Sequence, residues 1–276
     1  MQPPPNTTGT GPYTASDIRP GDPYELSNGH LIECMGTGQR GARNNAAGTI
    51  LLGTDPNARS VGVDAGISTN PKMLRAPDIV IGDLEDKPGW APQAPPLAVE
   101  YADTGQDEPE LRKKIAELLA AGTQLIWVVR LHGPRCVEVH APNAPIRIAR
   151  IGETLEAPEI LRNPVPVSAL YDPNEAQRLA LRNLLQREGY ENLQAVRDEG
   201  HQKGLDEGHQ KGLDEGHKEA RKQVLLELLE ERFGHASAGI NARIDNARLD
   251  QLRSWTRAVL TASSIEDVFV RDTPPE

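Results

Sequence analysis

Cysteine is scarce in this chain: only Cys34 and Cys136 occur among its 276 residues. Two cysteines cannot build a disulfide framework, so we expect a protein of the reducing cytoplasm. Long hydrophobic runs are missing as well, because no stretch approaches the ~20 apolar residues that a membrane-spanning helix requires. The start, Met1-Gln2-Pro3-Pro4-Pro5, lacks the charged and apolar regions of a secretion signal. The composition therefore favours a cytoplasmic protein without a membrane span.

Basic charge is also in short supply, since 30 Lys and Arg oppose 40 Asp and Glu and give a formal net charge of −10. This balance argues against an ordinary basic module for binding nucleic acid. A protein of this charge that acts on phosphates needs a local basic surface or a bound metal ion to tolerate them. Aromatic residues make up only 4% of the chain, whereas Leu, Ile and Val are common, which suits a compact α/β core.

The chain changes character along its length. Strand-like runs surround one well-capped helix up to about residue 172, and helical patterns follow. Strands, then a helix, then more strands predict a mixed sheet with helices packed on it. We therefore divide the chain into a disordered Pro/Gly-rich arm (1–22), an α/β domain (23–172), a long helical segment with a glycine repeat (173–235) and a small helical tail (236–276).

The best-defined helix of the α/β domain runs from Pro109 to Ala121, where Asp107 or Glu108 can cap its start and Gly122 suits its end. A weaker helix is expected near residues 43–52. The predicted strands are a hairpin that turns at Ser27-Asn28-Gly29, between a strand from Tyr24 and one through Leu31–Glu33, and runs at Ser60–Val63, Asp78–Ile81, Leu97–Tyr101, Leu125–Arg130 and Cys136–His140.

Glycine recurs at every fourth position of an eight-residue repeat that begins at Glu199: Gly200, Gly204, Gly208, Gly212 and Gly216. Each glycine costs a helix about 1 kcal/mol relative to alanine. Alternating Glu and Lys at i,i+4 stabilise a helix by only about 0.2–0.5 kcal/mol per pair, so an isolated helix here is marginally stable. The glycines also clear a narrow stripe along which another helix can approach. We therefore predict a long helix that is stabilised by a partner, preferably a second copy of the chain.

Two carboxylates and one ammonium form the candidate site. Asp78 lies on one predicted strand and Glu100 on another, each among core-type residues where an acid is costly without a positive partner. Strand alternation places Glu100 on the face of Ala98, opposite Tyr101. On the helix that follows, Lys114 borders the apolar stripe that faces the sheet, whereas Lys113 projects to solvent. Lys114 can therefore reach a site on the strands, and Lys113 is its natural control.

These residue types suit a divalent cation beside a phosphodiester. Mg²⁺, or Mn²⁺ in its place, prefers oxygen ligands and keeps several waters, and Asp78 and Glu100 can supply two such ligands. Glu110 lies one turn before Lys114 and can orient its ammonium. Taken singly, Asp78 can be a turn acid and Lys114 a lysine at the edge of a helix. Together, these residues predict a metal-dependent nuclease with Asp78, Glu100, Glu110 and Lys114 as its catalytic residues.

Residues of about 22–165 resemble the Uma-type putative restriction endonuclease family, a bacterial branch of the PD-(D/E)xK nuclease superfamily. The matching residues are Tyr24-Glu25-Leu26, Gly29, Glu33, Pro77-Asp78, Val99-Glu100, Glu110, Lys114, Gly122, Trp127 and Val137-Glu138-Val139. The resemblance implies a restriction-endonuclease-like mixed sheet flanked by helices, in an enzyme that acts on DNA. In that family the motif lysine has moved from the strand to the following helix, which fits the lack of a lysine in Glu100-Tyr101-Ala102.

As a hypothesis, Asp78, Glu100 and the Tyr101 carbonyl bind Mg²⁺, and Glu33 completes the metal shell or positions a second water. An ordinary exposed acid is an equal interpretation of Glu33. Two departures from the family pattern bear on activity: Leu118 stands where a tyrosine is usual, and the histidine common in the first helix is missing near residues 42–44. The tail from about Glu199 resembles the end of recombination-promoting nucleases and putative transposases of the same superfamily.

Two classes of function remain open at this point. The first is a Mg²⁺-dependent endonuclease, for which the sequence does not distinguish DNA from RNA. The second is a non-catalytic scaffold with a nuclease-like core that acts as an oligomeric binding or assembly protein, which the acidic balance favours. The presence of Asp78, Glu100, Glu110 and Lys114 together favours the nuclease. In either class we expect a homodimer, formed through the nuclease domain or the helical repeat, because two-fold assemblies dominate among homo-oligomers.

Overall fold

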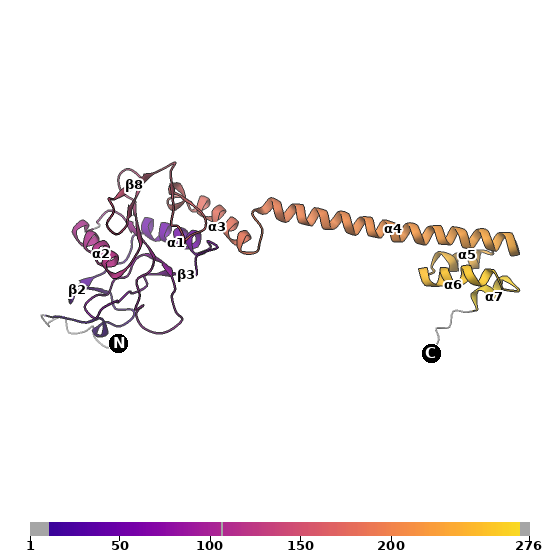
Figure 1. The fold of residues 1–276 in the computed structure, drawn as a ribbon, viewed down its shortest axis with the longest axis horizontal. Helices are drawn as coiled ribbons and strands as arrows, with labels where there is room; N and C mark the ends of the chain where they lie inside the picture. The colour runs from indigo at the N-terminus through magenta and orange to yellow at the C-terminus, as the bar shows by residue number, and fades with distance from the viewer. Residues whose placement is uncertain (1–10, 106, 271–276) are drawn as a thin grey trace. The chain divides into compact units, whose positions relative to one another are not determined.

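The computed structural model describes residues 11–105 and 107–270, and it divides into two compact units with a boundary between Leu193 and Gln194 (Figure 1). The first unit contains a six-stranded sheet in the order β3-β4-β5-β6-β7-β8. Its strands are β3 (Ser60–Val63), β4 (Ile79–Gly82), β5 (Leu97–Ala102), β6 (Leu125–Arg130), β7 (Cys136–His140) and β8 (Arg147–Arg150).

The sheet is mixed, as the sequence predicts. Strands β5 and β6 are parallel, and every other neighbouring pair is antiparallel. The parallel pair needs a crossover connection, which is the helix α2 (Glu108–Ala121). The side chain of Asp107 caps α2 by accepting from the Glu110 amide, and Gly122 ends it in the left-handed region at a φ of 115°. Both caps are those expected from the sequence.

Helices cover both faces of the sheet (Figure 1). On one face, α1 (Gln39–Gly53) and α3 (Pro173–Arg187) pack with the odd-numbered residues of the central strands, including Ile79, Val99 and Trp127. On the other face, Leu111, Ile115 and Leu118 of α2 cover Ala98, Ala102, Ile126 and Val128. The result is the restriction-endonuclease-like architecture of a mixed sheet between helices.

Glycine in α1 permits one close approach. Tyr101 points to the α1 face, and its hydroxyl lies where a Cβ on Gly48 would be. The sequence marks Gly48 as a weakness in the predicted helix, because glycine lowers helix propensity. The packing supplies the reason for it: no larger residue leaves room for the Tyr101 ring.

A separate hairpin lies outside the main sheet. It consists of β1 (Tyr24–Ser27) and β2 (His30–Glu33), joined through Asn28 and Gly29, which both have positive φ. Residues 11–22, which we expected to belong to a disordered arm, pack against this hairpin: Ala15 of the 3₁₀ turn η1 (Ala15–Asp17) and Ile18 are buried with Leu26 and Leu74. The apolar side chains of this segment give it a docking site despite its Pro and Gly content. The rest of the expected arm, residues 1–10, lies outside the described residues.

The remaining short elements of the first unit lie between β8 and α3. They are the two-stranded pair β9 (Thr154–Leu155) and β10 (Val165–Pro166), and the 3₁₀ helix η2 (Val167–Leu170). The strands β8, β9 and β10 were not predicted from the sequence. Strand β8 reads Arg-Ile-Ala-Arg at the sheet edge, where only Ala149 is buried, so it lacks the apolar run that reveals a central strand.

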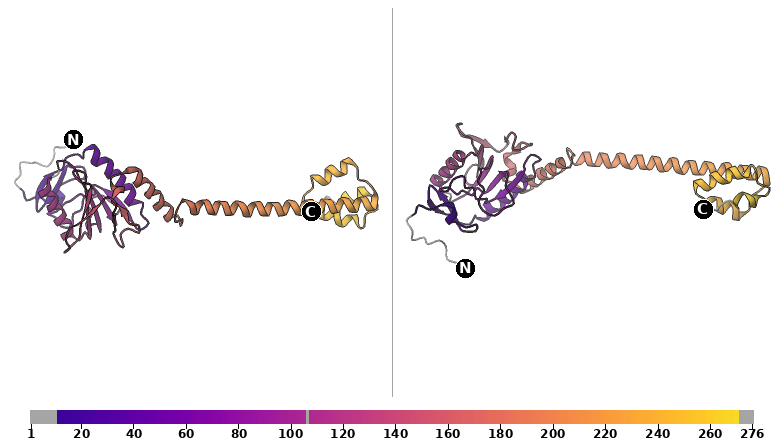
Figure 2. Two further views of the ribbon diagram at one scale, coloured as in Figure 1. Left: turned by 90° about the horizontal axis from the view of Figure 1, so that it is seen from above. Right: turned by 60° about the horizontal axis from the view of Figure 1, so that its bottom comes forward.

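The second unit is built around the long helix α4 (Leu193–Phe233). Leu225 and Leu229 near its end pack with α5 (Ala238–Asp245), α6 (Leu249–Val259) and α7 (Ile265–Phe269), whose largest buried residue is Trp255 (Figure 2). We expected the helical segment to begin at residue 173. The structure instead places α3 against α1 in the first unit, because Ala176 and Ala180 present a small apolar face to the core. Gly189, at a φ of 89°, then interrupts the helix.

Among the residues that the structure describes, no helix combines the length and apolar character needed to cross a bilayer.

Candidate active site

Strand pairing brings Asp78 and Glu100 together. Ile79 pairs with Val99 and Val80 with Ala98, so the next step of the antiparallel ladder sets Asp78 opposite Glu100. Opposite residues of such a pair point to the same face with Cβ atoms about 5 Å apart. That face is the one covered by α2. The same reasoning on β3 sets Asp64 opposite Asp78, and the Asp64 amide donates to the Asp78 carbonyl at 3.4 Å.

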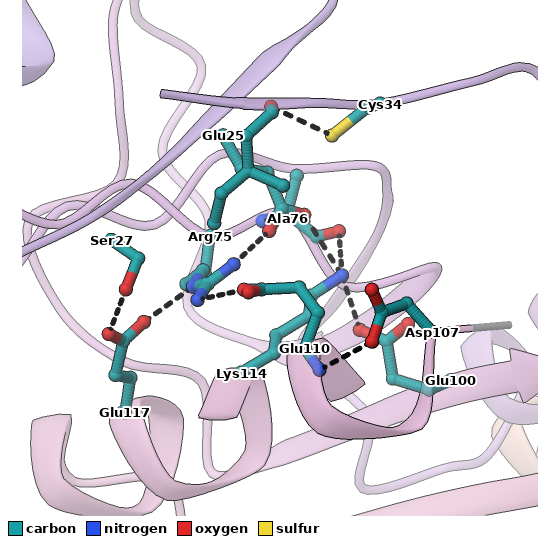
Figure 3. Close-up of polar contacts among 11 residues, drawn as sticks. Glu25, Ser27, Cys34, Arg75, Ala76, Glu100, Asp107, Glu110, Lys114 and Glu117 are labelled. Carbon is teal, nitrogen blue, oxygen red and sulfur yellow. Dashed lines mark hydrogen bonds and ion pairs between the residues drawn. The ribbon is translucent and has the colours of Figure 1, made fainter. Parts of the chain in front are cut away.

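Lys114 reaches this row of acids from α2. Its Nζ lies 2.7 Å from Oε1 of Glu100 and 2.9 Å from Oε1 of Glu25 on β1. It also donates to the Ala76 carbonyl at 2.8 Å. Figure 3 shows the ammonium held among these three acceptors. The Lys114 side chain is only 13% exposed, so the charge is largely removed from water.

The charges of the site are unequally compensated. Burial would lower the pKa of Lys114, but Glu100 and Glu25 outweigh it and raise that pKa, so the amine stays protonated. Burial raises the pKa of Glu100 against the attraction of Lys114. Burial also raises the pKa of Asp78, although its Oδ2 accepts from the Tyr101 amide at 2.6 Å. Lys114 therefore does not fully compensate the negative charges of Asp78 and Glu100, whose pKa values stay raised.

A buried arginine lies behind Lys114. Arg75 directly precedes the Ala76-Pro77-Asp78 motif, and its side chain is completely buried. Its guanidinium pairs with three carboxylates: Glu25 at 2.9 Å, Glu110 at 2.7 Å and Glu117 at 2.6 Å. It therefore joins the hairpin, the loop before β4 and the helix α2 in one charged network (Figure 3).

Comparison with known proteins identifies the family. The family model Uma2, described as putative restriction endonuclease, matches residues 12–169, which is more than half of the chain. The chain belongs to the Uma2 family. This confirms the resemblance stated above for the first unit, whereas the resemblance of the tail remains a prediction.

A solved structure supports the fold of this Uma2 domain. A putative nuclease belonging to DUF820 from Anabaena variabilis ATCC 29413 is 14% identical, with a TM-score of 0.51, over 60% of this chain and 99% of that one. At this identity the likeness concerns the fold. A DrdV–DNA complex also aligns, at 11% identity and a TM-score of 0.27, over 81% of this chain and 19% of that one. No curated protein matches the chain.

Two predicted site residues of the Uma2 chain lie elsewhere. Glu110 was expected to orient Lys114, but its carboxylate pairs with the buried Arg75 guanidinium at 2.7 Å instead. Glu33 was expected near the metal. It pairs with Tyr24 in the hairpin ladder and is exposed, and strand alternation places it on the hairpin face opposite to Glu25.

Three charged residues of this site were not predicted from the sequence: Glu25, Arg75 and Asp64. Glu25 lies within the quoted Tyr24-Glu25-Leu26 match, beside the fully buried Leu26, and Arg75 lies beside the Asp78 motif. The buried Leu26 and the Asp78 motif were the sequence features that could have indicated Glu25 and Arg75. Asp64 follows β3 at a positive φ of 50° and resembles an ordinary turn residue. Burial raises the pKa of Asp64, and at longer range the charge of Lys114 lowers it while that of Glu25 raises it.

The donor set fits a hard divalent cation. Among the described residues, no three His, Cys, Asp or Glu side chains converge as a metal site. Mg²⁺ does not require three, since it is usually held by one or two carboxylates and completes its shell with water and phosphate oxygens. Asp78, directly before β4, and Glu100 on β5 offer that number, and burial raises the pKa of both, so a cation would favour their charged forms.

Proposed function

We propose that this Uma2-family protein is a metal-dependent endonuclease that hydrolyses phosphodiester bonds in DNA, with Mg²⁺ or Mn²⁺ as its cofactor. The proposal depends mainly on one observation: Asp78, directly before β4, faces Glu100 of β5, and Lys114 contacts Glu100 at 2.7 Å. Membership of a family of restriction-endonuclease type supports the reaction class. The free cysteines, Cys34 and Cys136, suit a reducing cytoplasm.

Each residue has a role in the proposal. Asp78, Glu100 and the Tyr101 carbonyl would hold the cation, which when bound lowers the pKa of a coordinated water and offsets charge on the phosphate. The Tyr101 amide fixes the Asp78 carboxylate by donating to its Oδ2. Lys114 keeps its proton, because Glu100 and Glu25 raise its pKa, and presents a fixed positive charge to the five-coordinate phosphorus of the transition state. A prepositioned charge of this kind costs no reorganisation during the reaction.

Thermal denaturation with Mn²⁺ tests the metal site. At a hundredfold excess over Kd, binding adds about 2.7 kcal/mol, or about 5–10 °C for a unit of this size. Asp78→Ala/Glu100→Ala is expected to remove this shift. The matched control is Asp83→Ala/Glu85→Ala, which also deletes two acids but from an exposed loop, where their side chains are 62% and 68% exposed. A shift that survives in the first double variant contradicts the proposed ligands.

Cleavage assays separate the nuclease from the scaffold. We expect wild-type protein to cut plasmid DNA with Mg²⁺ or Mn²⁺, and EDTA to abolish cutting. A labelled RNA assayed in parallel decides the substrate. Protein that binds Mn²⁺ but cuts neither polymer would support the non-catalytic scaffold instead.

We also propose that α4 pairs with α4 of a second copy. Between residues 193 and 221 its side chains are almost all exposed, and a Cβ on any glycine of the repeat would meet no other atom within 4 Å. Leu205 and Leu213 stand exposed beside this stripe at 54% and 44%. Lys203 pairs with Glu199 and Lys211 with Glu215 along the same helix, so its charges alternate and can match those of an antiparallel copy.

Sedimentation velocity tests the pairing. Gly204→Ile/Gly208→Ile fills the stripe and is expected to shift the protein from dimer to monomer. Gln202→Ile/Asp206→Ile adds the same side chains on the opposite side of the helix, since each residue advances by about 100°, and is expected to leave the dimer intact. A wild-type protein that sediments as a monomer at micromolar concentration contradicts the proposal.

A further inference from the structure

Glu25 contacts the lysine from outside the row of acids. Its Oε1 lies 2.9 Å from Nζ of Lys114 and accepts from the Ala76 amide at 3.1 Å. Its Oε2 pairs with Arg75 at 2.9 Å. The residue is 6% exposed, and it comes from the β1 hairpin rather than from the main sheet. Lys114 therefore has two carboxylate partners on different elements.

The two carboxylate partners of Lys114, Glu100 and Glu25, differ in their other contacts. Glu100 is a proposed metal ligand, so a cation and Lys114 would draw on the same carboxylate. Glu25 is tied to Arg75 and the Ala76 amide. Its pKa is lowered, because Lys114 and Arg75 outweigh the effect of burial. The contacts with Arg75 and the Ala76 amide fix this carboxylate in place independently of Glu100.

Arg75 makes this placement rigid. Its other two partners, Glu110 and Glu117, both lie on α2, the helix that carries Lys114. Glu117 also accepts a hydrogen bond from the Ser27 hydroxyl at 2.5 Å. Glu25 and Ser27 share one face of β1, so the hairpin is bound to α2 at both positions (Figure 3).

We propose that Glu25 is a positioning residue that holds the Lys114 ammonium at the site when a cation engages Glu100, and that Arg75 fixes Glu25 for this purpose. The proposal rests on the function proposed above in assigning Glu100 to the cation. With Glu25 present, Lys114 keeps an ion pair and the Ala76 carbonyl. Without it, the ammonium has Glu100 as its one carboxylate partner among the contacts described, and it would lose that partner when a cation is held there.

Competitive amine labelling tests the hold on Lys114 without requiring activity. Protein saturated with Mn²⁺ is treated with a limiting amount of acetic anhydride, and acetylation of Lys114 is measured by mass spectrometry against its exposed neighbour Lys113. We expect Glu25→Gln to raise the Lys114-to-Lys113 ratio by about tenfold, as loss of one charge-assisted hydrogen bond implies. Glu117→Gln also removes a partner of Arg75 but does not touch Lys114, and its ratio should equal that of wild type.

Steady-state cleavage supplies the second readout. Glu25→Gln should lower kcat by about tenfold and leave KM for DNA unchanged, because the lost contact orients Lys114 rather than binding substrate. An unchanged labelling ratio in Glu25→Gln, or an equal rise in Glu117→Gln, overturns the inference. If Glu25→Gln does not fold, Glu25→Asp withdraws the carboxylate by one methylene and should give a smaller rise, and no rise overturns the inference. Wild-type protein that lacks cleavage refutes the nuclease, whereas labelling still decides the role of Glu25.

Discussion

Lys114→Ala is expected to reduce the rate of DNA cleavage by about 10²–10³-fold, the usual cost of removing one fixed group that stabilises charge in a transition state. The ammonium lies 2.7 Å from Glu100 and is held by Glu25 and the Ala76 carbonyl, so it is already in place before the reaction. Single-turnover cleavage of a labelled duplex at saturating Mn²⁺ measures the effect.

Lys113→Ala is the control for this result. Lys113 is the adjacent residue on α2 and is exposed, so its loss removes the same charge from the solvent side. Surface substitutions of this kind change free energies by about 0.5 kcal/mol or less, which is about twofold in rate. Both variants must show native circular dichroism, because Lys114→Ala leaves Glu25 and Glu100 without their shared cation. Equal losses in the two variants would remove Lys114 from the proposed role.

Arg75→Met is expected to destabilise the first unit by about 3–5 kcal/mol, the cost of leaving buried partners of a charged network unpaired. Arg75 is completely buried, and methionine fills much of its volume without a charge. Glu25 then loses a cation inside the protein, whereas Glu110 and Glu117, at 30% and 22% exposure, recover part of their hydration. Most of the expected loss in the free energy of unfolding therefore comes from the buried Glu25.

Urea denaturation measures this effect on the first unit. In a Trp255→Phe background the remaining tryptophans, Trp90 and Trp127, both lie in the first unit, so their fluorescence follows its unfolding alone. Arg59→Met is the control, because its pair with Asp83 is exposed at 78% and 62% and is expected to contribute at most about 1 kcal/mol. Similar losses for the two variants would show that the Arg75 network contributes no more than a surface ion pair.

The central arrangement of the site could be predicted from sequence because it depends on local periodicity. Alternation along two strands places Asp78 and Glu100 on one face, and the apolar stripe of α2 directs Lys114 toward that face. The caps of α2 follow from Asp107 and Gly122. None of these inferences requires knowledge of how distant segments dock.

Contacts between distant segments could not be predicted in the same way. Glu25 meets Arg75 and Lys114 across 50 and 89 positions of the chain, through a hairpin that is not part of the six-stranded sheet. Glu33 has the strand position and charge expected of a metal ligand, but the hairpin presents its other face to α2. A shift of one residue along the strand would exchange the two faces of the hairpin, and the sequence pattern alone does not decide which face packs against α2. The helix α3 is similar, because its small apolar face becomes recognisable only once α1 lies beside it.

An anomalous difference map from crystals soaked in Mn²⁺ would locate the cation relative to Asp78 and Glu100. We expect one strong peak between these two carboxylates, within about 2.3 Å of an oxygen of each, with Lys114 still paired to Glu25. A peak elsewhere in a crystal whose site is open to solvent, or Mn²⁺ bound at Asp78 with Glu100 paired only to Lys114, would contradict it.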